Sequence, residues 1–511
     1  MKAIPLDGYN LTLADVHDII SGQARALIAD KAKQRVERCH AFIRQVVSSD
    51  QVMYGINTGF GNFKHKTIAK DQLAQLQLNL VRSHACGVGE PLSYGESLAV
   101  VLLRLNCLLR GHSGVSMAVI NGLCELLNSR THAYIPSQGS VGASGDLAPL
   151  AHLALVLIGE GEIIDAKGER RPCRETLEHM EYLPLALGPK EGLALINGTP
   201  VMTALGALQF IELSNLLQHA DIALALSLEG FKGSLRAFDG RIHQLKNSMG
   251  QRVTAGNVRL LCRDSAIHES HESCCRVQDP YSFRCAPQVH GSVKDIYHYA
   301  SAILENEFNS VTDNPLIFAE DKTVLSGGNF HGAAIGYILD FMAIAATDLA
   351  SICERRIEVL TRAHEAGLPS FLIAQGGLNS GFMIPQVTAA ALVSQCKTLA
   401  HPASVDTIPT SQEQEDHVSM ATNAALKLRR VVANLKHVVA IELFSAAQAV
   451  AMQQPLTPGT GTAIAYGLIR EKAPFVAQDR AFYKDFAQLR TLIDSRAIPR
   501  ALSRAGIKIG T

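Results

Sequence analysis

A run of small residues from Gly139 to Gly145 holds the most suggestive chemistry in the chain. Its last three residues, Ala143-Ser144-Gly145, are the minimum for an internal cyclisation. In a tight, strained turn the Gly145 nitrogen can reach the Ala143 carbonyl carbon, and glycine tolerates that turn because it has no Cβ. Loss of water closes a five-membered ring, and loss of the Ser144 hydroxyl leaves an exocyclic methylidene. The product would be an electrophile made without an external cofactor.

A plainer interpretation of the same segment is the start of a helix. Asp146 suits an N-cap, and Pro149 suits the first helical turn. That interpretation accounts for these two residues. It does not need the Ala-Ser-Gly run before them, so the cyclisation hypothesis stands beside it.

Long helices must position these residues. Apolar side chains recur at helical spacing in three runs of more than about 25 residues, against an ordinary mean of roughly 11–12. The runs extend from Met202 to Leu228, from Ile335 to Leu360 and from Ala421 to about Met452. They predict a mainly α fold with a long-helix bundle. We expect some faces of this bundle to be buried against other subunits. We expect an N-terminal domain with the electrophile loop over residues 1–200 and the bundle over residues 201–511.

Stretches rich in Gly, Pro and Ser separate the helical runs and predict loops, because the backbone there does not stay helical. They span Pro136–Gly145, Asp279–Gly291, Leu325–Gly332 and His401–Ser411. Strand signals are short and few, such as those at 162–165 and 323–325. The chemically suggestive clusters lie in these loops or just beyond them, where loops held on a rigid scaffold usually carry function.

The composition is that of a large soluble protein. The 511 residues are 47% hydrophobic, and 47 basic residues balance 47 acidic ones. Zero net charge gives no field that would recruit nucleic acid or an anionic membrane surface. Eleven cysteines without a C-x-x-C pair, and an N-terminus without signal-peptide features, predict a reducing, cytoplasmic location. The most apolar long stretch carries Glu212, His219 and Asp221, so we predict that it does not span a membrane.

Several phrases of the sequence resemble the aromatic amino acid lyases that carry a methylidene-imidazolone group. The phrase from Ala143 to Leu150 is similar to the signature of that family as a whole, and chance agreement over so many positions is negligible. The resemblance continues along nearly the whole chain, in an order and spacing that match the histidine branch of the family. The further matching phrases are 54–61, 83–89, 195–199, 277–285, 327–332 and 414–420.

The resemblance implies a bundle of the lyase/fumarase-like type, assembled as a homotetramer whose active sites draw residues from more than one subunit. It implies a 5-methylidene-imidazol-5-one formed autocatalytically from Ala143-Ser144-Gly145, with no external cofactor. The implied reaction is the non-oxidative deamination of L-histidine to trans-urocanate and ammonia, the first step of histidine degradation. A positioned base contributes only about 10²–10⁴-fold, whereas enzymes supply at least about 10⁶-fold. An electrophile must therefore activate the amine.

The roles of the family carry over to matching positions. Arg284 resembles the carboxylate clamp, a task that suits a bidentate guanidinium. Tyr54 and Asn197 resemble the residues that polarise the electrophile and orient the amine, and Asp146 resembles the residue that orients the ring-forming backbone. The expected substrate-shaping or electrophile-supporting positions are Gln278, Asn329 and Phe330.

The base that removes the β-proton stays open at the level of sequence. Tyr281 is similar to the base that the family prefers, while Tyr54 and Glu415 are competitors. A tyrosine base needs a lowered pKa, which a sequence does not display.

Two residues would decide the substrate. His84 matches a histidine of the histidine branch that can hydrogen-bond an imidazole, and Glu415 stands where phenylalanine and tyrosine lyases carry an amide. A carboxylate gains a charge-assisted partner from an imidazole, but facing a bare phenyl ring it would be desolvated and unpaired. This asymmetry favours histidine over phenylalanine. Tyrosine is the nearer rival because its hydroxyl could bond either group.

Other interpretations stay open. A tyrosine ammonia-lyase or an aminomutase would use the same electrophile, and a non-catalytic relative would keep the helical scaffold with a damaged Ala-Ser-Gly run, which is intact here. His268, His271, Cys274 and Cys275 invite a zinc assignment. Because adjacent cysteines point in different directions on a helix, we predict no metal.

Overall fold

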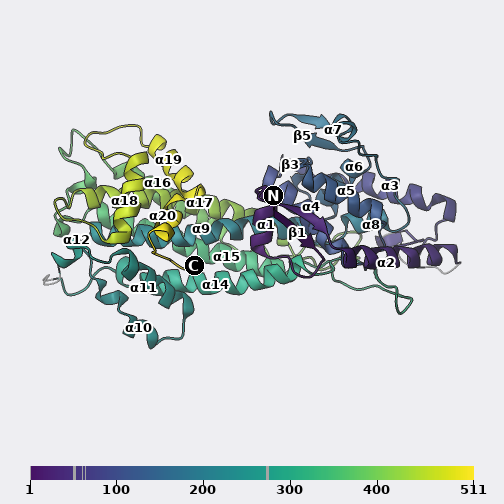
Figure 1. Ribbon diagram of the computed structural model, residues 1–511, viewed down its shortest axis with the longest axis horizontal. Coiled ribbons are helices and arrows are strands. Elements are labelled where there is room, and N and C mark those ends of the chain that lie inside the picture. Colours follow the sequence, from purple (N-terminus) through teal and green to yellow (C-terminus); the bar gives the residue numbers. More distant parts are fainter. Residues whose placement is uncertain (1, 50–52, 54, 60, 64, 272–275) are drawn as a thin grey trace. The chain divides into compact units, whose positions relative to one another are not determined.

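The computed structural model describes residues 2–49, 53, 55–59, 61–63, 65–271 and 276–511. Helices dominate it, as Figure 1 shows. The first half holds α1 (Leu13–Ile20), α2 (Asp30–Ser48), α3 (Leu73–His84), α4 (Tyr94–Leu108), α5 (Met117–Asn128), α6 (Leu147–Leu157), α7 (Arg174–His179), α8 (Glu191–Ile196), α9 (Pro200–Gly230) and α10 (Gly240–Gln244). The second half holds α11 (Met249–Leu261), α12 (Ala266–Glu269), α13 (Tyr281–Arg284), α14 (Ala286–Phe308), α15 (Ala333–Thr361), α16 (Met383–Leu399), α17 (Ala421–Ala451), α18 (Thr460–Lys472), α19 (Tyr483–Asp494) and α20 (Ala497–Arg504). The predicted mainly α fold is confirmed.

Strands form only short pairs in the described part of the chain. The pair β1 (Lys2–Leu6) and β2 (Ala24–Ile28) is parallel, with Lys2 opposite Ala24. The antiparallel pairs are β3 (Val88–Pro91) with β4 (Pro136–Gln138), β5 (Glu162–Ile164) with β6 (Arg170–Pro172), and β7 (Leu316–Phe318) with β8 (Thr323–Leu325). The two strand signals found in the sequence correspond to β5 and β8.

The three predicted helical runs correspond to α9, α15 and α17, which are 31, 29 and 31 residues long. Two of them, α9 and α15, are long and apolar enough to cross a membrane by length and composition. The most apolar window of each is 78% and 72% buried inside the protein, which is the pattern of a core helix.

One predicted loop is wrong. The stretch Asp279–Gly291 is mostly helical, because α13 occupies its first part and α14 begins at Ala286. Pro287 is the second residue of α14, where the N–H that proline lacks has no intrahelical acceptor to lose. The proline therefore marks the start of a helix and not a break.

The chain divides into two compact units. The first comprises residues 1–211, 301–340 and 402–426, and the second comprises 212–300, 341–401 and 427–511. The sequence placed a single boundary near residue 200; the units follow contacts in space, so two later segments join the first unit. The domain assignment from sequence stays a prediction.

Three short helices of the first unit, α3, α6 and α8, begin or end next to predicted site residues. Helices α3, α6 and α8 pack against one another, and β4 packs against α6. Gly192 in α8 lies so close to the Gln77 backbone of α3 that a Cβ would collide with it. Since α3 ends at His84, α6 follows Gly145 and α8 ends just before Asn197, this packing brings three motif phrases together.

Candidate functional site

Backbone contacts hold the predicted electrophile segment against the turn at Gly198. Gly145 and Gly198 form an isolated parallel bridge. The amide of Asp146 donates to the Gly198 carbonyl at 2.7 Å, and the Gly198 amide donates to the Ser144 carbonyl at 3.4 Å. The φ angles of the two glycines are +74° and +132°, and a Cβ on Gly145 would collide with the backbone of Gly198. This approach therefore requires glycine at position 145, whereas a Cβ on Gly198 would collide with the Thr312 carbonyl.

The Asp146 carboxylate is fully buried and accepts four hydrogen bonds. Two come from the hydroxyls of Ser140 at 2.9 Å and Thr422 at 2.7 Å. The other two come from the amides of Val201 at 3.0 Å and Met202 at 2.9 Å. Burial raises the pKa of Asp146, and the four hydrogen bonds act in the opposite direction.

These contacts correct the helix-start interpretation of Asp146. The residue occupies the N-cap position of α6, but its side chain makes no capping hydrogen bond there. It instead satisfies the free amides in the first turn of α9, where a helix end favours negative charge. The carboxylate thus ties the cyclising segment to a second helix.

The segment that begins α17 closes over the same loop. The Met420 amide donates to the Val141 carbonyl at 3.0 Å, and the Ser419 hydroxyl donates to the Gly142 carbonyl at 3.3 Å. A Cβ on Gly142 would collide with the Ser419 hydroxyl. The cyclising segment is therefore held on two sides, by residues 197–202 and by residues 419–422.

Asn197 lies beside Ser144 and is only 1% exposed. The Ser144 hydroxyl donates to the Asn197 side-chain oxygen at 3.2 Å. The Asn197 side-chain nitrogen donates to the Asp313 carboxylate at 3.1 Å and to the Asn314 carbonyl at 3.0 Å. Asp313 in turn forms a fully buried ion pair with Lys190, at 2.8 Å. The chemistry available here is a hydroxyl that faces a buried acceptor, which is itself held by two hydrogen bonds.

His84 and Glu415 interact electrostatically. Burial lowers the pKa of His84, whereas a hydrogen bond to the Leu80 carbonyl and the negative charge of Glu415 act to raise it. The Leu80 carbonyl lies 2.8 Å from His84 Nδ1, so Nδ1 carries the proton and Nε2 is left as an acceptor. A neutral imidazole and a carboxylate near it suit a ligand that donates N–H groups.

A tight turn presents Glu415. Thr410 and Glu415 pair their backbones, and three of the four intervening residues, 411–413, have positive φ. Side chains without glycine's freedom are strained in this region, by roughly 1–2 kcal/mol each. The Glu415 carboxylate accepts hydrogen bonds from the hydroxyls of Thr410 at 2.7 Å and Ser411 at 2.9 Å. Strain of this kind clusters at functional sites.

Gln278, Tyr281 and Arg284 belong to the second unit. Gln278 is exposed, Tyr281 is 69% exposed, and the Arg284 guanidinium lies 4.3 Å from the centre of the Tyr281 ring. Phe283 anchors α13 by stacking on Phe231, with ring centres 4.8 Å apart. The predicted clamp and base therefore stand next to each other on an outward-facing turn.

Other predicted site residues have less definite surroundings. Tyr54 lies outside the described residues. Asn329 is exposed and Phe330 is partly buried, just before His331, whose ring stacks on that of His417 in the first unit. Within the described part of the chain, no hydrogen bond joins Asn329 or Phe330 to Ser144.

Sequence reasoning missed the residues that hold the predicted ones. They are Ser140, Lys190, Asp313, Ser419 and Thr422. Ser140, Ser419 and Thr422 lie in or beside motif phrases, so proximity to a motif was the available signal. Lys190 and Asp313 are 123 residues apart and match no motif, so nothing in the sequence pairs them.

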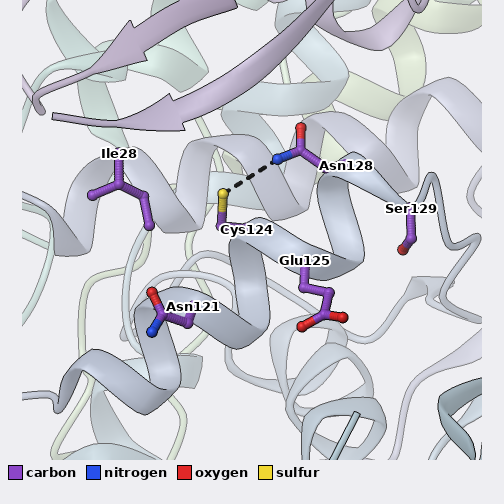
Figure 2. A pocket seen from close by; sticks show the side chains of 6 residues that line it. All are labelled: Ile28, Asn121, Cys124, Glu125, Asn128 and Ser129. Carbon is purple, nitrogen blue, oxygen red and sulfur yellow. Dashed lines mark hydrogen bonds between the residues drawn. The ribbon is translucent and has the colours of Figure 1, made fainter. Parts of the chain in front are cut away.

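A cavity of about 470 Å³ lies elsewhere in the first unit, beside α5 (Figure 2). Its lining residues include none of the predicted site residues. The Asn128 side-chain amide donates to the Cys124 thiol at 3.4 Å, and burial raises the pKa of that thiol. A thiol kept protonated is a poor nucleophile.

No group of three or more His, Cys, Asp or Glu side chains among the described residues could hold a metal ion. Cys274 and Cys275, two of the residues that invite a zinc assignment, lie outside that part of the chain.

The sequence matches the family model of the aromatic amino acid lyases over residues 11–471. The chain belongs to this family, and it is an enzyme of the ammonia-lyase type. This confirms the resemblance found in the sequence.

Individual relatives and solved structures give a more specific comparison than the family model does. The chain is 47% identical to the histidine ammonia-lyase of Alkaliphilus oremlandii over 505 residues, which is 99% of each protein. Its fold matches the crystal structure of histidine ammonia-lyase from Trypanosoma cruzi with a TM-score of 0.91 and 39% identity, covering 99% of this chain and 95% of the other. It also matches tyrosine aminomutase from Streptomyces globisporus with a TM-score of 0.93 and 34% identity, covering 98% of each. The predicted bundle type is thereby confirmed.

Proposed function

We propose that this chain catalyses the non-oxidative deamination of L-histidine to trans-urocanate and ammonia, the first step of histidine degradation. The observation that carries the proposal is the centre where the Ser144 hydroxyl meets Asn197 and the loop is pinned to Gly198. Full-length identity of 47% to a histidine ammonia-lyase supports the choice of substrate.

The residues of the loop fit an electrophile formed from Ala143-Ser144-Gly145. Gly145 has a positive φ and no room for a side chain, as a tight internal cyclisation requires. Asp146 holds the next peptide in place through four hydrogen bonds. The chemistry supplied by a 5-methylidene-imidazol-5-one at this position is activation of the substrate amine as a leaving group.

The side chains of the protein divide the remaining work. Arg284 binds the substrate carboxylate with parallel N–H donors. Asn197 orients the α-amine beside Ser144, together with Tyr54. Tyr281 removes the β-proton, so that the C–H electron pair becomes the new double bond as ammonia departs. Tyr54 and Glu415 are the competing candidates for this base.

His84 and Glu415 select the imidazole ring. His84 Nε2 is an acceptor, and the Glu415 carboxylate is a charged acceptor whose field reaches His84. An imidazole donates N–H to such groups, whereas a phenyl ring leaves both unpaired in a desolvated site. Gln278, Asn329 and Phe330 complete the proposed pocket.

The proposed enzyme works as a homotetramer in the cytoplasm, without nucleic acid, membrane or metal. The exposure of Tyr281 on a single chain supports assembly, because a base and a carboxylate clamp need to be shielded from water. A site completed by more than one subunit would provide that shielding.

The competing function is that of a tyrosine ammonia-lyase or an aminomutase, favoured by the match to tyrosine aminomutase. Incubation of the purified protein with histidine and with tyrosine, followed by product spectra and amino acid analysis, separates them. Urocanate from histidine supports the proposal. Coumarate or a β-amino acid from tyrosine, with histidine untouched, would overturn it.

A further inference from the structure

Beyond the residues that face the substrate, a buried ion pair fixes which atom of Asn197 points to the reaction centre. Lys190 immediately precedes α8, and Asn197 immediately follows it. Asp313 comes from a distant part of the first unit and contacts both, with one carboxylate oxygen on each. Lys190 and Asp313 are completely buried.

The hydrogen bonds of Asn197 leave its amide only one orientation. A side-chain amide has a nitrogen that donates twice and an oxygen that only accepts. The nitrogen is satisfied by two groups that only accept, the Asp313 carboxylate and the Asn314 carbonyl. A flipped amide would set its oxygen against both of them. The oxygen must therefore face Ser144, whose hydroxyl donates to it at 3.2 Å.

Lys190 compensates the buried charge of Asp313, which is the acceptor that this orientation of the Asn197 amide needs. Its ammonium group lies 2.8 Å from one carboxylate oxygen, which leaves the other to accept from Asn197 and from the Asn314 amide at 2.7 Å. A buried carboxylate without a cation would be costly, because burial removes its charge from water. The main-chain carbonyl of Asn197 is also held, by Arg104 at 2.5 Å.

We propose that Asp313, paired with Lys190, is a positioning residue that locks the Asn197 side-chain oxygen toward the amine of the substrate. Once Ser144 loses its hydroxyl, that oxygen has lost its donor and would accept an N–H of the α-amine, which would orient the amine beside position 144. This inference rests on the proposed deamination, and it assigns to Asn197 an accepting role only.

The substitution Asp313→Asn tests the lock. The buried Lys190 ammonium demands the oxygen of the new amide, so the NH₂ of that amide faces Asn197 and turns it over. We expect kcat/KM for histidine to fall by about 10–100-fold, the effect of losing a hydrogen bond to a charged or polarised group. Two other measurements should stay close to those of the parent protein. The intact mass should still be lower by two waters, and the inhibition constant of trans-urocanate, which has no amine, should change by less than threefold.

The exchange variant Asn197→Asp/Asp313→Asn gives a second test in the same scaffold. Its residue 197 accepts from the new amide and still presents an oxygen to the amine, but it no longer donates to the Asn314 carbonyl. It should therefore recover part of the histidine turnover that Asp313→Asn loses. The control is Asp485→Asn, which makes the same change in the ion pair of Asp485 with Arg480 in the second unit. This control should stay within twofold of the parent protein.

The outcomes separate the inference from the proposed function. Unchanged kcat/KM in Asp313→Asn, an equal loss of urocanate affinity, or an exchange variant no better than Asp313→Asn would each overturn the positioning role. If Asp313→Asn does not fold, the exchange variant decides alone: histidine turnover supports the lock, and its absence in a matured protein overturns it. An unsubstituted protein without the mass loss or histidine turnover would instead refute the proposed function.

Discussion

Asn197 and Asp146 in the first unit are almost completely buried and hydrogen-bonded on more than one side, whereas Tyr281 in the second unit is 69% exposed. The side chains of the first region are held by hydrogen bonds within the chain. In the second region the proposed base Tyr281 lies exposed, beside the partly buried Arg284, on a short helix anchored by Phe283. A single chain therefore holds the proposed electrophile segment from several sides and leaves the proposed base exposed.

The buried region should show the largest effect. Ser144→Ala removes the hydroxyl that must leave, so the base and binding residues remain without the electrophile. Since a base supplies at most about 10⁴-fold of a total of at least about 10⁶-fold, kcat should fall by at least about 10²-fold. Steady-state turnover of histidine measures this. Ser116→Ala, at an N-cap whose side chain makes no capping bond, serves as the control. Equal losses in the two variants would contradict the comparison.

A substitution in the exposed region should affect substrate binding more than formation of the electrophile. Arg284→Gln removes the bidentate donor, and a charge-assisted hydrogen bond is worth about 10–100-fold in KM for histidine. Histamine, which lacks the carboxylate, should inhibit the variant and the parent equally. Arg252→Gln, at an exposed position of α11, should leave KM unchanged. A variant in which histamine and histidine weaken together would remove the clamp assignment.

Glu415 should produce an intermediate effect with a definite pH dependence. Glu415→Gln removes the ionic partner of the imidazole, so kcat/KM for histidine should fall by about tenfold or more. The charge of Glu415 raises the pKa of His84, which burial lowers. Without that charge, His84 is protonated only at lower pH. Its Nε2 therefore remains a hydrogen-bond acceptor at a more acidic pH than in the parent. The acid-side rise of KM should therefore shift to lower pH than in the parent.

The control for this effect is Glu413→Gln, an exposed carboxylate in the same turn. The imidazole of the free substrate titrates identically in the three assays. A difference between the pH profiles of KM therefore comes from groups of the enzyme. A Glu415→Gln profile that coincides with the parent, or shifts to higher pH, would contradict the pairing with His84.

The smallest effect belongs to the cavity beside α5. Cys124→Ser keeps a small polar group next to Asn128 and touches no proposed site residue. Histidine turnover should stay within about twofold, because the cavity beside Cys124 is lined by none of the proposed site residues. A loss of tenfold or more would give this cavity a role in the reaction.

Local patterns account for what the sequence predicted. The long helices α9, α15 and α17 follow from a periodicity that neighbouring residues carry, and the Ala143-Ser144-Gly145 centre follows from a contiguous phrase. The helical start at Ala286 was missed because Pro287 reads as a breaker unless its place in the first turn is known.

Contacts between distant segments account for what the sequence did not predict. Asp146 looked like the cap of its own helix, yet its carboxylate caps α9. Lys190 and Asp313 meet only through the fold, and no composition or spacing links them. The proposed catalytic residues were therefore easier to predict than the residues that hold them.

Everything in this account depends on the backbone at Ser144 having closed upon itself. Mass spectrometry of the intact purified chain is the most direct test. The account predicts a mass lower than that of the sequence by two water molecules, with the difference mapping to a peptide that contains residues 143–145. A full-length chain with the unmodified mass and an ordinary serine at position 144 would contradict it.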